Sequence, residues 1–184
     1  MARRYEISLS QEAVLQAAFR VLDEEGLEAL TMRRLAAGLS VQAPALYWHV
    51  KDKAALLQLM ASRIYADARA GVPASPDWRS WLIAFGHSLR RTLLAHRDAA
   101  RLVATARSGA AADAEARARS IAAPLVALGL DQRSGVMFQA SVISLALGWS
   151  TYQEGPMREP LQAMMDFDEA YDVGLRALVA GYRA

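Results

Sequence analysis

The sequence predicts an all-α protein with a three-helix helix-turn-helix head and a helical-bundle body. Alanine and leucine dominate every segment of the 184 residues, and both residue types favour helices. Apolar residues recur at intervals of three and four, and no strand-length run of alternating β-branched residues occurs. Ser, Thr or Asp stands where several apolar stripes begin, and Gly or Pro where they end, as is typical of helix termini.

The first helix is predicted from about Ser10 to Glu25. Ser10 is a favourable N-cap, and Gly26 is a favourable stop. One face carries the apolar residues Val14, Ala17, Ala18, Val21 and Leu22. We expect this helix to pack behind the two helices that follow and to support them.

Residues 31–53, TMRRLAAGLSVQAPALYWHVKDK, predict two short helices joined by a tight turn. Thr31 is a favourable N-cap for the first helix, whose outer face carries Arg33. Gly38 is expected to adopt the positive φ of the turn, because glycine has no Cβ. The second helix is expected to begin near Gln42.

The second helix separates an apolar side from a polar aromatic side. Pro44 falls in its first turn, where a missing N–H does no harm, and Leu46 and Val50 lie four residues apart on the buried side. Three side chains that combine an apolar ring with a polar tip remain near its far end: Tyr47, Trp48 and His49. Such groups can lie against sugars while donating hydrogen bonds to phosphate, so the pattern predicts a unit that reads a DNA groove.

A fourth helix is predicted from Lys53 to about Arg69, with Asp52 as its N-cap. Lys51 and Lys53 at its start can hold phosphates. A Pro-rich break at residues 71–77 follows this helix. The expected organisation is a DNA-binding head over residues 1–53, a connecting helix over 53–69 and a ligand-binding and dimerisation body over 70–184.

The run LYWHVKDKAALL, residues 46–57, resembles the TetR family of bacterial repressors, most closely the tetracycline repressor branch. The resemblance implies a helix-turn-helix head that binds double-stranded operator DNA. Ala43 and Ala45 stand where that branch has base-contacting Gln and Thr, so we expect a different operator sequence. The candidate DNA-contacting residues are Arg33, Gln42, Pro44, Ala45, Tyr47, Trp48, His49 and Lys53.

Composition and missing motifs exclude several classes of function. The net charge of +2 provides no broad basic surface, so DNA contacts must be focused. Without cysteine there is no disulfide or thiolate site, and the N-terminus lacks the apolar run of a signal peptide, so we expect a cytoplasmic protein. No catalytic or phosphate-binding motif occurs, and His87 and His96 lack a ligand partner at helical spacing. We therefore expect no enzyme activity, no cofactor and no metal.

The body is predicted to contain five or six helices. Five expected ranges are about Asp77 to Ala95, His96 to Arg107, Asp113 to Leu128 with a kink at Pro124, Asp131 to Gln153, and Phe167 to Tyr182. Residues 155–160, GPMREP, are expected to be irregular.

The last two long helices are apolar on most sides. The run from Val136 to Trp149 contains Gln139 and two serines and is too short for a membrane span, which needs about 20 residues. A helix buried on one side by its own chain and on the other by a partner fits better, which predicts a homodimer with a four-helix interface. The alternative is that both helices form the core of a monomer.

Residues 77–107 also resemble the tetracycline repressors, in LRRTLLAHRDAA above all. The resemblance puts Val103 where that branch has a metal-binding His, and only Arg107 of the drug-binding set survives. This excludes a magnesium–tetracycline chelate and favours a small, mostly apolar effector. The candidate ligand-binding residues are Phe85, Leu89, Val103, Arg107, Trp149 and Tyr152.

The expected function is that of a ligand-responsive transcriptional regulator, a repressor released from a palindromic operator by its effector. Activation instead of repression remains open. The alternative from another class is a helical ligand-binding or scaffold protein that never binds DNA.

Overall fold

A computed structural model of the chain describes residues 9–106 and 113–183. Over these residues it is all-α, which confirms the predicted fold class. The elements are α1 (Gln11–Glu25), the 3-10 turn η1 (Leu27–Ala29), α2 (Met32–Gly38), α3 (Ala43–Tyr47), α4 (Lys53–Ala70), α5 (Trp78–Leu94), α6 (Ala99–Thr105), α7 (Ala114–Val126), α8 (Gln132–Glu154), α9 (Arg158–Gln162) and α10 (Phe167–Ala180).

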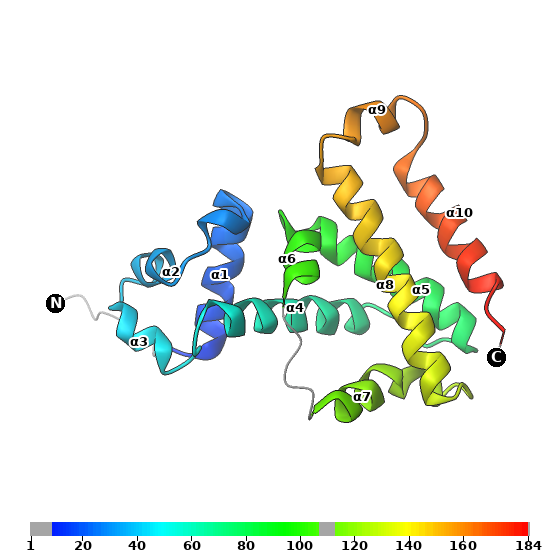
Figure 1. Cartoon of the computed structure of the whole chain (residues 1–184), viewed down its shortest axis with the longest axis horizontal. Coiled ribbons are helices and arrows are strands. Elements are labelled where there is room, and N and C mark those ends of the chain that lie inside the picture. The colour runs from blue at the N-terminus through cyan, green and yellow to red at the C-terminus, as the bar shows by residue number, and fades with distance from the viewer. Residues whose placement is uncertain (1–8, 107–112, 184) are drawn as a thin grey trace.

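The helices form a small head and a larger body with α4 between them (Figure 1). α1, α2 and α3 lie together at one end, and α4 extends from them into the body. There α4 packs against α5 and α6, while α8 packs against α5, α7 and α10. The body is therefore a bundle around α5 and α8, and α4 is in contact with both parts.

Local capping signals set most helix starts. The side chain of Ser10 accepts a hydrogen bond from the N–H of Ala13 at 3.1 Å, and Thr31 accepts one from Arg34 at 3.1 Å. Asp52 accepts one from the N–H of Ala55 at 2.7 Å and starts α4. These bonds satisfy N–H groups that have no partner inside the helix, so the predicted starts are confirmed.

The turn between α2 and α3 differs from the prediction. Gly38 ends α2, and the residue with positive φ is Ser40, at 55°. The N–H of Ser40 donates to the carbonyl of Ala37, and the N–H of Val41 donates to that of Ala36. These two bonds form a Schellman motif, which requires the left-handed conformation two residues later than expected. The prediction for Gly38 was wrong. These two hydrogen bonds, and not the residue type, determine which residue adopts the positive φ.

Ser40→Gly is expected to stabilise the protein by about 1 kcal/mol, because a serine at positive φ is strained and glycine is not. Gly129 provides the reverse control. It ends α7 with the same two hydrogen bonds at φ 91°, so Gly129→Ser should destabilise. Urea denaturation at one protein concentration measures both changes, and a Ser40→Gly variant no more stable than the parent would contradict this explanation.

Two other segments depart from the expected ranges. α6 begins at Ala99 instead of His96, because Asp98 has a φ of 57° and breaks the helical conformation. Residues 155–160 were expected to be irregular, but α9 begins inside them at Arg158. Pro160 lies in its first turn, where the missing N–H is tolerated.

Candidate nucleic-acid interface and ligand cavity

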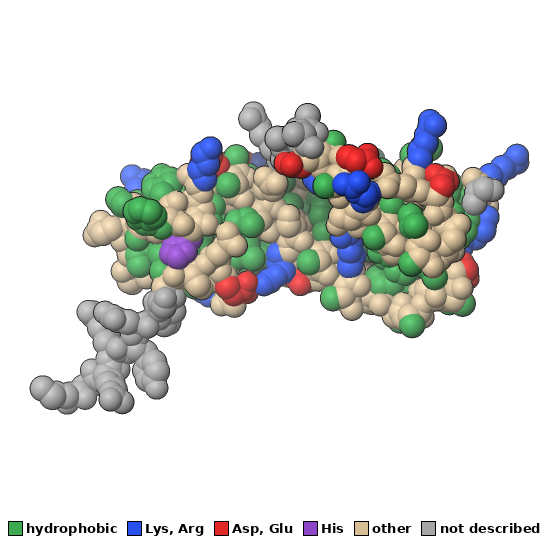
Figure 2. All heavy atoms as spheres, turned by 90° about the horizontal axis from the view of Figure 1, so that it is seen from below, with side chains coloured by type: hydrophobic (Ala, Val, Ile, Leu, Met, Phe, Trp, Pro, Cys, Tyr) green, Lys and Arg blue, Asp and Glu red, His purple; other side chains and the backbone are tan. Residues whose placement is uncertain are grey.

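The aromatic pair of α3 points away from the protein. Trp48 is 89% exposed and Tyr47 is 53% exposed, while Leu46 and Val50 on the other side are buried. Figure 2, seen from below the view of Figure 1, shows hydrophobic side chains at the surface of the head end. Because Leu46 and Val50 already anchor the segment, the exposed rings have no role in the core.

The α3 segment is tied to α1 behind it. The side-chain amide of Gln11 donates to the carbonyl of His49 at 3.3 Å, immediately after the helix ends. His49 is itself half-buried. This hydrogen bond and the burial of Leu46 and Val50 fix the backbone that carries the exposed aromatic side chains.

The two arginines of α2 differ in whether they already form an ion pair within the described part of the chain. Arg34 forms an ion pair with Glu25 at 2.5 Å, and the hydrogen bond from Arg34 lowers the pKa of Glu25. Arg33 is exposed and has no ion-pair partner among residues 9–106 and 113–183. Lys53 at the start of α4 is exposed as well. Exposed cations therefore stand on the helix before α3 and on the helix after it.

The remaining candidate DNA contacts lie at the start of α3. Gln42 is the N-cap residue, but its side chain forms no capping bond and is exposed. Pro44 is exposed in the first turn, and Ala45 is half-buried. The structure thus places all eight predicted residues on α2, on α3 with its N-cap residue and the turn after it, or at the first residue of α4.

An interlocking contact, which we call the head–body joint, connects the α1–η1 corner (residues 23–28) to the α5–α6 corner (residues 96–101). The Oδ2 atom of Asp98 accepts a hydrogen bond from the N–H of Leu27 at 2.9 Å. Asp23 faces His96, with 3.0 Å between Oδ2 and Nδ1. A further ion pair joins Arg101 to Glu28.

The joint is closely packed. A Cβ on Gly26, whose φ is 86°, would lie 2.9 Å from Oδ2 of Asp98. Asp98 also faces the end of α8, where burial and this carboxylate raise the pKa of Glu154 to about 7. Two acidic residues of this corner, Asp23 of α1 and Glu28 of η1, therefore bind the body, a role that their sequence pattern does not show.

A cavity of about 320 Å³ opens between α4, α6 and α7. Its polar lining comes mainly from one face of α4, and its apolar lining includes Val103 of α6, Ala106 just after α6, and Ile121 of α7. The α4 residues lie at helical spacing, so they share a face. The full lining is Gln58, Ala61, Ser62, Tyr65, Arg69, Val103, Ala106, Arg117, Ser120 and Ile121.

The ligand-binding residues predicted from the sequence do not come together. Val103 lines the cavity, but Phe85 and Leu89 are fully enclosed in the core and do not. Trp149 and Tyr152 lie near the other end of α8, where Trp149 contacts the ring of Phe167 at 6.1 Å between centroids. Arg107 lies outside the described residues. The cavity is therefore a different set from the predicted one.

Sequence reasoning missed the α4 contribution to the cavity. Gln58, Ser62, Tyr65 and Arg69 form a polar stripe along a helix that is buried on its other side. This stripe is visible in the sequence, but it looks like an ordinary solvent-exposed face. Only the packing of α6 and α7 over it makes it the wall of a cavity.

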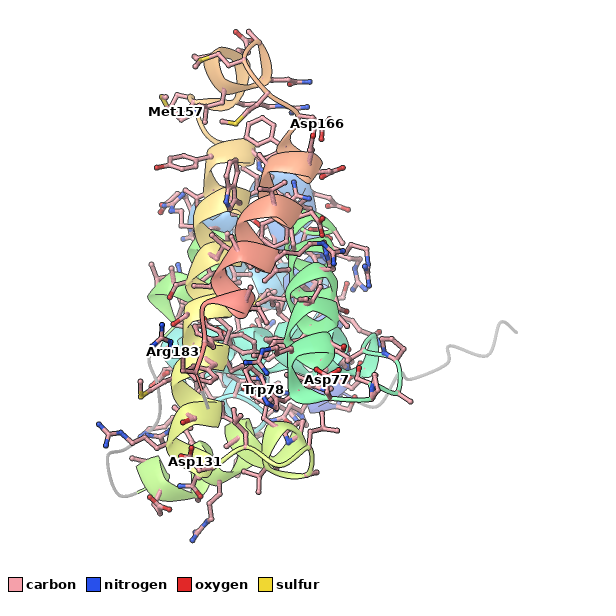
Figure 3. All side chains as sticks on the ribbon, turned by 90° about the vertical axis from the view of Figure 1, so that its right-hand side faces the viewer. Asp77, Trp78, Asp131, Met157, Asp166 and Arg183 are labelled. Carbon is pink, nitrogen blue, oxygen red and sulfur yellow. The ribbon has the colours of Figure 1, made fainter. Side chains whose placement is uncertain are left out.

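The outer face of α8 and α10 has no partner among the described residues. Met137 and Val173 are 52% and 61% exposed. Added Cβ atoms at Gly148 and Gly174 would meet nothing within 4 Å. Figure 3 shows α8 and α10 side by side, with Asp166 at the start of α10 and Arg183 just beyond its end. Small and apolar residues on an exposed helix pair are typical of a helix-packed interface.

No helix in the described part of the chain is long and apolar enough to cross a membrane. The same residues contain no group of three His, Asp or Glu side chains placed to hold a metal ion.

Comparison with known proteins gives a consistent result for both parts of the chain. Residues 14–60 match "Bacterial regulatory proteins, tetR family", and residues 72–134 match "Tetracyclin repressor-like, C-terminal domain". The tetracycline repressor protein class A from transposon 1721 of Escherichia coli is 37% identical over 194 residues, which cover 94% of this chain and 90% of that protein.

Two solved structures show the same architecture. A tetracycline repressor variant from Acinetobacter baumannii AYE, in complex with minocycline, is 32% identical with a TM-score of 0.76 and covers 94% of this chain and 96% of its own. BioQ with its double-stranded DNA operator is 32% identical with a TM-score of 0.69 and covers 94% and 97%. The chain described here belongs to the TetR family of bacterial transcriptional regulators.

Proposed function

We propose that this protein is a ligand-responsive repressor that binds a palindromic operator as a homodimer. The observation that carries the proposal is the exposed pair Tyr47 and Trp48 beside a buried anchor, with the exposed cations Arg33 and Lys53 on the helices before and after α3. This arrangement suits a helix that enters the major groove while its neighbours grip phosphates. Residues 1–53 are the DNA-binding head in this proposal, and residues 70–184 are the body. Such a protein acts where the chromosome lies, in the cytoplasm.

The exposed face of α8 and α10 supports the homodimer. A two-fold axis through this face would pair α8 and α10 with their copies in a four-helix interface. Two heads held by one body can bind two half-sites together, which raises affinity far above that of one head. The same symmetry requires an inverted repeat in the operator.

The cavity between α4, α6 and α7 is the proposed effector site. Thr105 near the end of α6 lies beside Lys53 and Leu57 in the first two turns of α4, where a second hollow is formed. A ligand that moves α6 against α4 therefore acts on Lys53, a proposed phosphate contact. It shifts the operator equilibrium only by its different affinity for the two arrangements.

Selection from random duplex DNA tests this proposal. We expect the recovered sequences to share an inverted repeat with half-sites about 10 base pairs, or a multiple of that, apart. Binding should weaken with salt, as phosphate contacts require. If no sequence is enriched, the alternative of a helical ligand-binding or scaffold protein without DNA binding is favoured.

Removing the central bond of the head–body joint is expected to cost about 1–3 kcal/mol of stability. Asp98→Ala loses the bond to Leu27 and places an alanine at positive φ. Asp98→Asn should retain most of the stability, because asparagine tolerates this conformation and can accept the same bond. Urea denaturation measures both variants.

Asp113 provides the matched control for the joint. It is an exposed N-cap residue of α7 whose side chain forms no capping bond, so Asp113→Ala should change little. Equal losses in Asp98→Ala and Asp113→Ala would show that the joint is not a stabilising contact.

A further inference from the structure

Arg69 is the unusual member of the cavity between α4, α6 and α7. Its Nε atom is buried and has no hydrogen-bond partner among the described residues. Burial lowers the pKa of this guanidinium, because the charged form has lost water contacts. The residue as a whole is half-buried, and a donor atom that has lost water without gaining a partner is costly unless a bound group replaces the lost contact.

The surroundings of Arg69 contain cations and neutral donors but no acid. Arg117 of α7 is the second cation in the lining, and no Asp or Glu belongs to the described lining residues. Tyr65 lies one turn before Arg69, and burial raises the pKa of its hydroxyl, which therefore stays protonated and able to donate. Gln58 and Ser62 add further donors along the same face of α4.

Apart from Ser120 of α7, the rest of the cavity lining is apolar. It consists of Val103 of α6, Ala106 just after α6, and Ile121 of α7, with Ala61 of α4. The volume of about 320 Å³ lies at the small end of the range for ligand pockets, about 300–1,000 Å³. The site therefore combines one charged, half-buried corner with an apolar wall, and the space suits a small molecule.

We propose that the ligand of this cavity is a small organic acid, whose carboxylate binds Arg69 and whose apolar body lies against Val103, Ala106 and Ile121. Carboxylate and guanidinium form paired, charge-assisted hydrogen bonds, the strongest kind that this lining can make. This inference rests on the proposed function, which assigns the effector to the same cavity. It adds the chemical class of that effector.

Matched acid and amide pairs test the proposal: benzoate with benzamide, cinnamate with cinnamamide, and 4-phenylbutyrate with 4-phenylbutanamide. Isothermal titration calorimetry of the full chain, without DNA, measures each affinity. We expect at least one acid to bind at least tenfold more tightly than its amide. Equal affinities within every pair, or no binding by any acid, would overturn the proposal.

Variants assign the preference to Arg69. Arg69→Gln should reduce acid affinity about 10- to 100-fold and leave amide affinity unchanged, which corresponds to the loss of a charge-assisted bond. Arg69→Lys, which keeps the charge, should retain part of the preference. Arg133→Gln, at an exposed arginine near the start of α8, is the control and should bind acids like the parent. A full acid preference in Arg69→Gln would overturn the assignment.

Operator binding separates this proposal from the function on which it rests. Fluorescence anisotropy with the selected operator, with and without saturating acid, provides the second readout. If an acid binds through Arg69 but operator affinity is unchanged, the ligand class stands and the effector role fails. If the operator binds and no acid does, the regulator stands and the ligand class fails.

Discussion

Replacing both exposed aromatic residues at the end of α3 by alanine is expected to weaken operator binding by about 1,000-fold without unfolding the protein. Tyr47 and Trp48 are 53% and 89% exposed, so their removal leaves no cavity in the core. Large aromatic contacts of this kind are often worth about 2 kcal/mol or more in a complex. Taking about 2 kcal/mol per head for the aromatic pair together, two heads lose about 4 kcal/mol, so the double variant should lose about 1,000-fold in operator affinity.

Fluorescence anisotropy over a range of salt concentrations, with circular dichroism melting, measures this effect. Lys53→Ala should lower the salt slope by about one per head, because it removes a phosphate contact, whereas the aromatic variant should keep most of the slope. Met164→Ala is the matched control, since Met164 is a 79% exposed apolar residue just after α9, which lies in the body away from the head (Figure 1). Unchanged operator affinity in the aromatic variant would refute the proposed DNA-binding surface.

Phe85→Ala is expected to destabilise the protein by about 3–5 kcal/mol, the usual cost of deleting a buried aromatic ring. Phe85 is fully enclosed and stacks on Trp81 with 5.1 Å between ring centroids. The sequence makes this residue a candidate for the ligand pocket with a core role as the alternative, and the structure encloses it in the core. A large loss of stability would therefore show that Phe85 is a core residue and not a wall of the ligand pocket.

Urea denaturation at one fixed protein concentration measures the cost, because stability of a dimer depends on concentration. Val126→Ala is the control, since Val126 is 46% exposed and should change stability by less than about 0.5 kcal/mol. Should Phe85→Ala unfold like the parent but lose ligand affinity, the assignment of Phe85 to the core would be wrong.

Sequence and structure agree where the signal is local. The caps at Ser10, Thr31 and Asp52 each depend on a side chain and an N–H three residues later, so a short window contains all the information. They disagree at Gly38, where residue type suggested the positive φ. Ser40 adopts it because the chain must bring Val41 back to Ala36.

The sequence by itself determined the all-α class, most helix boundaries, and the exposed aromatic set of α3. These features follow from capping residues, from helical spacing of apolar side chains, and from a motif within one segment. Only the tertiary structure decided which body residues surround a cavity and which fill the core. Val103 and Phe85 lie on comparable apolar stripes, and the packing of α4, α6 and α7 alone separates them. The same holds for Asp98 and Leu27, which are 71 residues apart and meet only when head and body are assembled.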